Sequence, residues 1–294
     1  MKISLVLATV GRVVEFSRFV ESAIAQTYRD FELVVVDQNP DDRLAAALSL
    51  ARESGIEVIH LKQMQCGLSS ARNAGLELAR GQLIAFPDDD CWYEPDTLGY
   101  AVSNFSRNPA WDGLVGNWVE VSAANRSEES RRPHLDLAKW RRFRGGDASS
   151  IMLFFRRAVF ARVGVFDPRL GVGSWFGAGE ETDFVIRALT AGFFIARSPD
   201  VRIHHAYDSS ASSFNHVSWR HLMRRGRGTG ALYVKHRLSW YVALRGTLSP
   251  PFKALLKLRS PVKAIAMSWG IAHGAFRWWA NSRRHSKRHV TTGT

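Results

Sequence analysis

Hydrophobic and polar positions in the first 90 residues follow two alternating patterns, one typical of buried strands and one typical of helices. Apolar runs of strand length lie at residues 2–9, 31–38, 56–62 and 82–87. Helical patterns lie between them, at residues 14–26, 41–52 and 67–80. This order predicts an α/β fold with a Rossmann-like, mostly parallel central sheet and flanking helices.

The pattern changes after residue 118. Residues 119–146 are polar, charged and without a clear period, so we expect a mobile loop there. Strands are predicted at residues 150–155 and 201–206, and a helix that begins near Glu180 lies between them. The remaining residues predict a basic helical C-terminal tail.

The composition indicates an ordinary globular protein. The 294 residues are 46% hydrophobic and 23% charged, which is enough to form a large core. Only two cysteines, Cys66 and Cys91, are present, and their spacing predicts neither a disulfide framework nor a zinc site. We interpret the first apolar run as a core strand and not as a signal peptide, and expect a cytoplasmic protein.

Charge is distributed unevenly along the chain. The net charge is +13, and 16 of the 40 lysines and arginines follow Asp208, after which no acidic residue occurs. Such an asymmetry predicts a polyanionic partner, either nucleic acid or an anionic membrane surface.

Three consecutive carboxylates, Asp88, Asp89 and Asp90, follow the fourth predicted strand. They repel one another, and a divalent cation such as Mg²⁺ or Mn²⁺ would offset that repulsion. Ligands of α/β sheets bind at the carboxyl ends of strands, where Asp37 also lies. The alternative interpretation is a solvated acidic turn that only ends the strand.

A series of motifs in one order resembles glycosyltransferase family 2. The motifs are LVLATVGR, FELVVVDQ, GLSSARNAGLELARGQLIAFPDDD, VGVFDPRLG and GEETDF, and the resemblance covers residues 3–208. It implies the GT-A fold and an inverting, metal-dependent hexosyltransferase. The donor would be a nucleotide-diphosphate sugar, with a UDP-sugar expected. The acceptor would be a glycan or a lipid-linked intermediate of cell-surface polysaccharide synthesis.

The resemblance also implies roles for individual residues. The nucleotide-sugar site would comprise Thr9, Arg12, Asp37, Arg72, Asn73, Asp88 and Asp89. The metal ligands would be Asp90, Asp88 and His205.

A second acidic cluster, in GEETDF, would supply the catalytic base. An inverting transfer needs a group that takes the proton of the acceptor hydroxyl. Family members usually have Glu-Asp here, whereas this chain has Glu180-Glu181, so we favour Glu181 and then Asp183. These carboxylates would also suit a helix N-terminus for electrostatic reasons alone. Trp175 and Glu180 are expected to bind the acceptor.

The tail predicts an amphipathic helix at a membrane surface, with tryptophans at the interface and arginines near lipid phosphates. A single transmembrane pass is the lesser alternative. We therefore expect a peripheral protein at the inner face of the cell membrane and no nucleic-acid partner. Two rival functions are a nucleotidyltransferase acting on a sugar phosphate and a non-catalytic nucleic-acid-binding or membrane-binding protein.

These predictions divide the chain into a catalytic domain and a tail. Residues 1–210 would form the catalytic domain, with a nucleotide-sugar-binding half at 1–118 and an acceptor-binding half at 119–210. Residues 211–294 would form the membrane-associating tail.

Overall fold

The structure is a computed structural model that describes the chain except for residues 121–130, 144–147, 206–216, 257–259 and 291–294. The chain divides into two compact units. The first unit comprises Met1–Trp140, Arg144–Phe166 and Phe184–Ala206, and the second comprises Arg141–Phe143, Asp167–Asp183 and Tyr207–Thr294.

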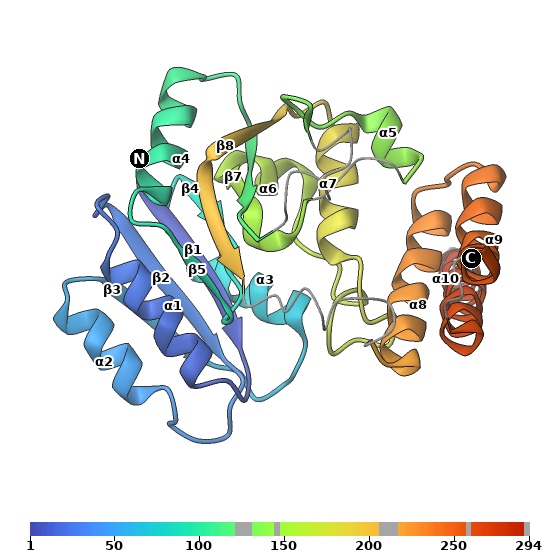
Figure 1. The fold of residues 1–294 in the computed structure, drawn as a ribbon, viewed down its shortest axis with the longest axis horizontal. Helices are drawn as coiled ribbons and strands as arrows, with labels where there is room; N and C mark the ends of the chain where they lie inside the picture. The colour runs from blue at the N-terminus through green and yellow to red at the C-terminus, as the bar shows by residue number, and fades with distance from the viewer. Residues whose placement is uncertain (121–130, 144–147, 206–216, 257–259, 291–294) are drawn as a thin grey trace. The chain divides into compact units, whose positions relative to one another are not determined.

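The first unit is built on an eight-stranded sheet with the order β3-β2-β1-β4-β7-β6-β8-β5 (Figure 1). The strands are β1 (Ile3–Thr9), β2 (Phe31–Asp37), β3 (Glu57–Lys62), β4 (Leu83–Ala85), β5 (Cys91–Tyr93), β6 (Gly113–Trp118), β7 (Leu153–Arg156) and β8 (Ile195–His205). Strands β3, β2, β1 and β4 run parallel, as the repeated strand–helix pattern predicts. The predicted α/β class is confirmed.

Beyond β4 the sheet is mixed, which the sequence pattern did not predict. Strand β7 is antiparallel to both β4 and β6, and β5 is antiparallel to β8. The run predicted as a strand at 150–155 is divided, because Ser150–Met152 forms a 3-10 turn before β7 begins. Hydrophobic periodicity shows which segments are buried but not the direction in which they pair.

Helices flank the sheet of the first unit. They are α1 (Val14–Ile24), α2 (Ala45–Glu53), α3 (Leu68–Leu78), α4 (Thr97–Arg107), α5 (Leu137–Arg141) and α6 (Arg157–Val163), and α7 (Glu180–Thr190) begins in the second unit and ends in the first. The apolar face expected on α1 is buried through Phe16, Phe19, Val20 and Ala23. Helix α5 contradicts the loop expected at 119–146, and of that segment residues 121–130 and 144–147 lie outside the described residues.

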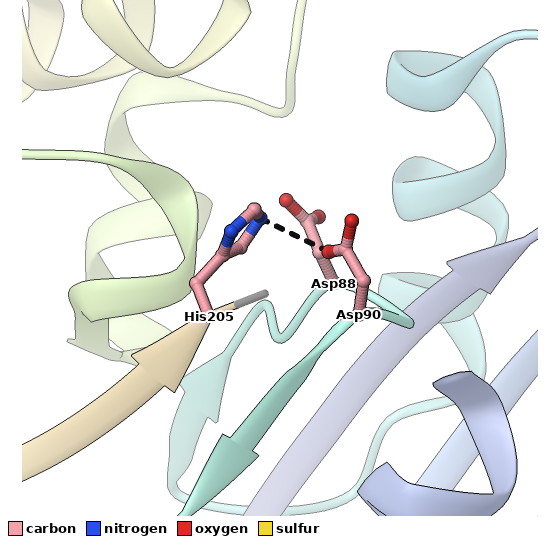
Figure 2. A group of neighbouring side chains, drawn as sticks. All are labelled: Asp88, Asp90 and His205. Carbon is pink, nitrogen blue, oxygen red and sulfur yellow. Dashed lines mark ion pairs between the residues drawn. The ribbon is translucent and has the colours of Figure 1, made fainter. Parts of the chain in front are cut away.

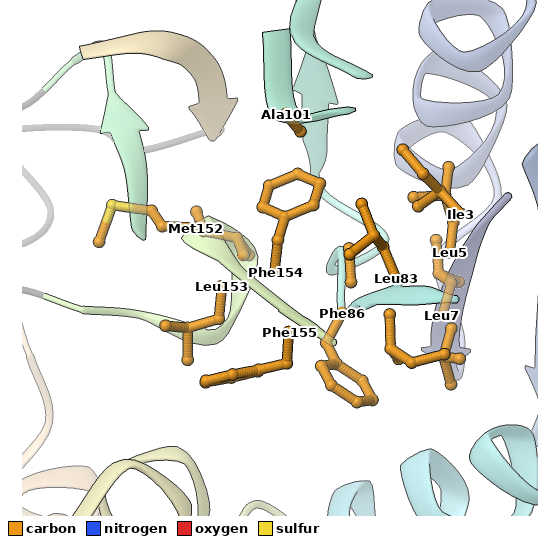
Figure 3. Close-up of a cluster of buried hydrophobic side chains, with 14 of the residues drawn as sticks. Ile3, Leu5, Leu7, Leu83, Phe86, Ala101, Met152, Leu153, Phe154 and Phe155 are labelled. Carbon is orange, nitrogen blue, oxygen red and sulfur yellow. The ribbon is translucent and has the colours of Figure 1, made fainter. Parts of the chain in front are cut away.

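The core of the first unit lies between the sheet and these helices. Alternate side chains of β1 meet those of β4 and β7, as Figure 3 shows for Leu5, Leu83 and Phe154. Every residue of β2 is buried, which fits a strand covered on both faces. Gly75 allows α3 to approach the sheet, because a Cβ there would lie 2.6 Å from Val6 Cγ1.

In the part of the second unit that the structure describes, α8 (Trp219–Lys235), α9 (Trp240–Leu256) and α10 (Pro261–Val290) follow one another, so the predicted helical tail is confirmed. Helices α8 and α10 pack backbone to backbone through Gly226, Gly230, Gly270 and Gly274. A Cβ on any of these four glycines would lie between 1.9 and 2.4 Å from a carbonyl oxygen of the other helix. Small residues four apart permit this close approach. No helix in the described part of the chain has the length and hydrophobicity that a membrane crossing needs.

Candidate active site

The carboxyl ends of the parallel strands gather the first group of polar side chains. Thr9 ends β1 and is the register partner of Asp37, which ends β2. Strand β4 pairs with the other side of β1, and the acidic triplet follows it. The chain then enters β5, where Cys91 pairs with His205 of β8. This pairing brings His205 to the triplet although 115 positions separate it from Asp90 in the sequence.

Asp88, Asp90 and His205 form the cluster that Figure 2 shows, and their ligand atoms lie within 4.8 Å of one another. His205 Nε2 lies 3.0 Å from Asp90 Oδ1. Burial by itself would lower the pKa of His205, but the neighbouring Asp90 and Asp88 outweigh it and raise that pKa. For Asp90 the signs are reversed: burial would raise its pKa, and His205 and Arg12 lower it.

These three residues fit a divalent cation. Asp90 Oδ1 is buried and, among the described residues, contacts His205 Nε2 at 3.0 Å, while His205 Nδ1 has no hydrogen-bond partner among them. Two carboxylates and an imidazole suit Mn²⁺, and the carboxylate oxygens suit Mg²⁺. The three residues are the metal ligands expected from the sequence, and the structure brings them together.

Asp89 points to different partners. Its two oxygens accept hydrogen bonds from Thr9 Oγ1 and Arg12 Nη1, each at 2.7 Å. Arg12 Nη1 also contacts Asp90 Oδ2. Burial raises the pKa of Asp89, and the bonds from Thr9 and Arg12 reduce that effect. Asp89 therefore ties the triplet to the loop after β1.

Arg72 lies on α3 and is 1% exposed. Its Nη2 donates to Asp88 Oδ1 at 2.7 Å and to Ser150 Oγ at 2.9 Å. A buried guanidinium needs such partners, since desolvation of an unpaired charge is costly. Arg72 thus fixes one carboxylate of the metal cluster.

Asn73, the next residue, has a different environment. Its amide nitrogen donates to the Phe166 carbonyl at 2.8 Å, and its amide oxygen accepts from the Phe166 backbone N–H at 3.0 Å. This reciprocal pair holds the start of the FDPRLG turn. Its contacts are with the backbone of that turn and not with the acidic triplet.

Asp37 is fully buried and has partners that the sequence analysis missed. Lys62 Nζ lies 2.9 Å and His60 Nε2 lies 3.1 Å from Asp37 Oδ2. Asn39 binds the other oxygen through its backbone and its side chain. Burial would raise the pKa of Asp37, and these partners lower it. The sequence feature that could have identified these partners is the alternation of side chains in β3, which places His60 and Lys62 on one face next to β2.

The second group of candidate residues lies in the second unit, where α7 begins with Glu180, Glu181 and Asp183. Glu180 is 5% exposed, and Asp183 is fully buried. Asp183 Oδ1 lies 2.7 Å from Lys235 Nζ and 2.9 Å from His236 Nε2, at the end of α8.

Lys235 joins Asp183 to a second carboxylate. Its Nζ also lies 2.7 Å from Asp167, which forms a two-point contact with Arg169. Lys235 and His236 were not predicted as site residues, because their segment belongs to the basic tail in the sequence pattern. No local motif marks them, since their partners lie more than 50 positions away.

Trp175, expected to bind the acceptor, is surrounded by side chains of α8 and α10. The guanidinium carbons of Arg227 and Arg277 lie 4.5 and 3.9 Å from the centre of its ring. His273 meets the same ring edge to face at 5.0 Å.

Comparisons with known proteins agree with this geometry. The chain is similar to a glucosyl-dolichyl phosphate glucuronosyltransferase of Haloferax volcanii, with 29% identity over 185 residues and 58% of each chain covered. It is also similar to a UDP-Glc:α-D-GlcNAc-diphosphoundecaprenol β-1,3-glucosyltransferase of Escherichia coli, with 37% identity over 75 residues, 25% of this chain and 29% of that one. The match thus spans little more than half of the first relative and less than a third of the second.

Among solved structures, the fold is similar to a mannosyltransferase of Pyrobaculum calidifontis in complex with GDP-Man and Mn²⁺. The TM-score is 0.67 at 17% identity, over 94% of this chain and 86% of that one. This likeness confirms the GT-A fold. The model of the glycosyl transferase family 2 matches residues 4–164, which is more than half of the chain. These residues include both the acidic triplet and the strand ends around it, and the chain therefore belongs to glycosyltransferase family 2.

Proposed function

We propose that the protein transfers a sugar from a nucleoside-diphosphate sugar to a glycan or lipid-linked acceptor, with inversion at the anomeric carbon. The observation that carries this proposal is the meeting of Asp88, Asp90 and His205 at the carboxyl ends of parallel strands in a family 2 chain. The relatives named above act on dolichyl-phosphate-linked and undecaprenyl-diphosphate-linked sugars, as their names state.

The donor's nucleotide would lie over the ends of β1 and β2. Asp37, with its pKa held low, remains ionised and would accept hydrogen bonds from the base or ribose. We expect UDP as the nucleotide. Arg12 is half exposed beside Asp89 and Asp90, where it would contact the phosphates.

Asp88, Asp90 and His205 would hold Mg²⁺ or Mn²⁺, which stabilises negative charge on a leaving diphosphate. The protein prepares this site without the donor. Arg72 fixes Asp88, Thr9 and Arg12 fix Asp89, and the β5–β8 pairing fixes His205. Ligands that are already oriented lose less conformational entropy on binding.

Glu181 is our choice for the catalytic base. Asp183 is fully buried and pairs with Lys235 and His236, so its carboxylate is committed to holding α7 on α8. Glu181 is only partly buried and lies two residues closer in the sequence to Gly177 and Gly179, which precede α7. Its carboxylate would take the proton of the acceptor hydroxyl as that oxygen attacks the sugar. Glu180 and Trp175, on the same segment, would contact the acceptor.

The acceptor would be reached from an anionic membrane surface on which α9 and α10 lie. Helix α9 exposes Trp240, Leu244, Leu248, Phe252 and Leu255, and α10 exposes Val262, Ile265, Trp269, Phe276 and Trp279. Each set repeats mainly every three or four residues, so each forms an apolar stripe along its helix. No acidic residue occurs on either helix, which favours anionic lipid. The protein would then be peripheral, at the inner face of the cell membrane.

A donor screen tests the proposed function. Purified full-length protein is incubated with UDP-sugars and GDP-sugars, Mn²⁺ and a lipid-diphosphate-linked sugar acceptor, and nucleoside diphosphate release is measured. At least one donor should give release that stops with EDTA and returns with added Mn²⁺. Turnover that EDTA leaves unchanged would contradict the metal site, and tight nucleic-acid binding without any release would contradict the enzymatic function.

A further inference from the structure

Trp175 lies between helices in a strongly basic part of the second unit. The guanidinium carbons of Arg227 and Arg277 lie 4.5 and 3.9 Å from the centre of the Trp175 ring. The two cations therefore lie close to each other. An indole face stabilises a guanidinium, but it does not neutralise the charge. Two like charges are thus held close together by a rigid aromatic ring.

Among the described residues, these arginines have no carboxylate to balance their charge. In the described part of the chain, no carboxylate oxygen lies within 4.0 Å of Arg224, Arg227 or Arg277. Arg227 Nε is a buried atom without a hydrogen-bond partner among the described residues. Burial, and then the neighbouring Arg224 and Arg277, lower the pKa of Arg227, as expected for a crowded cation.

Another arginine on a tryptophan in the same unit provides a contrast. The Arg169 guanidinium carbon lies 4.0 Å from the ring centre of Trp278, and Arg169 forms a two-point ion pair with Asp167. The charge of Arg169 is therefore balanced by a carboxylate of the protein. Arg227 Nη2 instead donates to the weak acceptor Met223 Sδ at 3.9 Å, and no carboxylate among the described residues pairs with Arg227 or Arg277, so an oxyanion would complete this site.

Trp175, which both arginines contact, lies on the segment that leads to Glu181, the proposed base. Gly228 of α8 accommodates the segment before α7, since a Cβ there would lie 2.3 Å from the Ala178 carbonyl oxygen. Gly177, one residue earlier, has a positive φ and packs on Arg224. Trp175 and Glu181 thus lie on one short segment that α8 holds in place.

We propose that Arg227 and Arg277, which share the Trp175 ring, and the neighbouring Arg224 bind the phosphate or diphosphate group of the acceptor. This inference rests on the proposed function and deepens it, because it makes the acceptor a phosphorylated one. The guanidinium groups would form charge-assisted hydrogen bonds with the phosphate oxygens. The sugar linked to that phosphate would then lie near Glu181.

The test uses inorganic pyrophosphate as the probe and full-length protein in EDTA, so that the metal cluster does not contribute. Binding is measured by calorimetry for the wild type, for R227Q/R277Q and for the matched control R220Q/R283Q. The control removes two exposed arginines that also stack on tryptophans of α8 and α10. We expect R227Q/R277Q to bind pyrophosphate at least about tenfold more weakly and the control to bind within about twofold of the wild type. Circular dichroism establishes that each variant folds, and the single variants R227Q and R277Q replace the double one if it does not.

Two results would overturn the site: unchanged affinity in R227Q/R277Q, or an equal loss in the control, which would indicate net charge alone. Sedimentation with phosphatidylglycerol vesicles separates the two sources of phosphate. R227Q/R277Q should remain with the vesicles, and its release would assign the arginines to a lipid headgroup and overturn the acceptor assignment. Donor turnover by the wild type is measured separately, so a failure of the proposed function is distinguished from a failure of the arginine site.

Discussion

Among single residues, the three aspartates of the triplet differ in their main partners, although Arg12 contacts both Asp89 and Asp90. Asp88 binds the buried Arg72, Asp89 binds the loop after β1, and Asp90 faces His205. The chain therefore separates neighbouring carboxylates that would otherwise repel one another. The buried Asp90 Oδ1, which faces His205 Nε2 at 3.0 Å, is the oxygen that a cation would bind.

Replacing a metal ligand should abolish tight cation binding without unfolding the protein. Asp90→Asn and His205→Ala should each weaken Mn²⁺ binding at least about tenfold, because each removes one of three ligands. Isothermal titration calorimetry measures the affinity. Asp200→Asn, an exposed carboxylate on the same strand as His205, is the matched control and should bind Mn²⁺ like the wild type. Equal affinities in all four proteins would contradict the assignment.

Acid should weaken the second unit through Asp167. Burial would raise the pKa of Asp167, but Arg169 and Lys235 lower it well below its ordinary value. The folded state therefore binds this proton less readily than the unfolded state does. The resulting stability, on the order of 2 kcal/mol, is present above about pH 4 and is lost as the pH falls below it.

The melting temperatures of the wild type and Asp167→Asn, measured between pH 7 and pH 2.5, test this expectation. The wild type should melt several degrees higher at pH 7, and the difference should shrink below pH 4. A difference that is independent of pH would show that Asp167 stabilises the unit by packing and not by charge.

At the scale of elements, glycines decide how α8 packs on α10. Gly230→Ala should lower the free energy of unfolding by about 1–3 kcal/mol, because its Cβ would lie 1.9 Å from the Ile271 carbonyl oxygen. Gly99→Ala in α4 is the control, since a Cβ there meets nothing closer than 3.9 Å. Alanine favours helix over glycine by up to about 1 kcal/mol, so this control should be neutral or stabilising. Urea unfolding curves measure both, and equal effects would contradict the close packing.

The sequence alone predicted some of the secondary structure elements and part of the candidate site. Apolar runs predicted the four parallel strands, and motif order predicted Asp88, Asp90 and His205 as one cluster. The pattern could not predict that β7 inserts antiparallel between β4 and β6, because burial leaves strand direction open. Nor could it pair Asp183 with Lys235, since that contact depends on how α8 packs. The GxxxG spacings of α8 and α10 were a readable signal of that packing.

At the scale of the whole molecule, the exposed apolar stripes should bind anionic lipid. Ile265→Glu combined with Trp269→Glu places two charges on the exposed face of α10, where both side chains are more than 60% exposed. Because these positions lie outside the α8–α10 contact, the fold should persist. The variant should bind phosphatidylglycerol vesicles at least about tenfold more weakly in sedimentation assays.

A matched control places the same charges elsewhere. Leu50→Glu combined with Val14→Glu changes two exposed apolar residues of the first unit and should leave vesicle binding unchanged. Vesicle binding by the wild type should also decrease with added salt, since part of the attraction is electrostatic. Wild-type protein that remains in the supernatant at low salt would contradict a membrane surface as partner.

In the proposed reaction, Glu181 takes the proton of the acceptor hydroxyl as the sugar is transferred. The most direct measurement compares the transfer rate and the donor affinity of the wild type, Glu181→Gln and Glu180→Gln, with the donor and acceptor from the screen. Glu181→Gln should reduce the rate by about 10²–10⁴-fold and leave donor affinity within about twofold, because only the proton acceptor is lost. Glu180→Gln should retain more of the rate. A Glu181→Gln enzyme that transfers sugar at the wild-type rate, while a folded Asp183→Asn enzyme does not, would contradict the account.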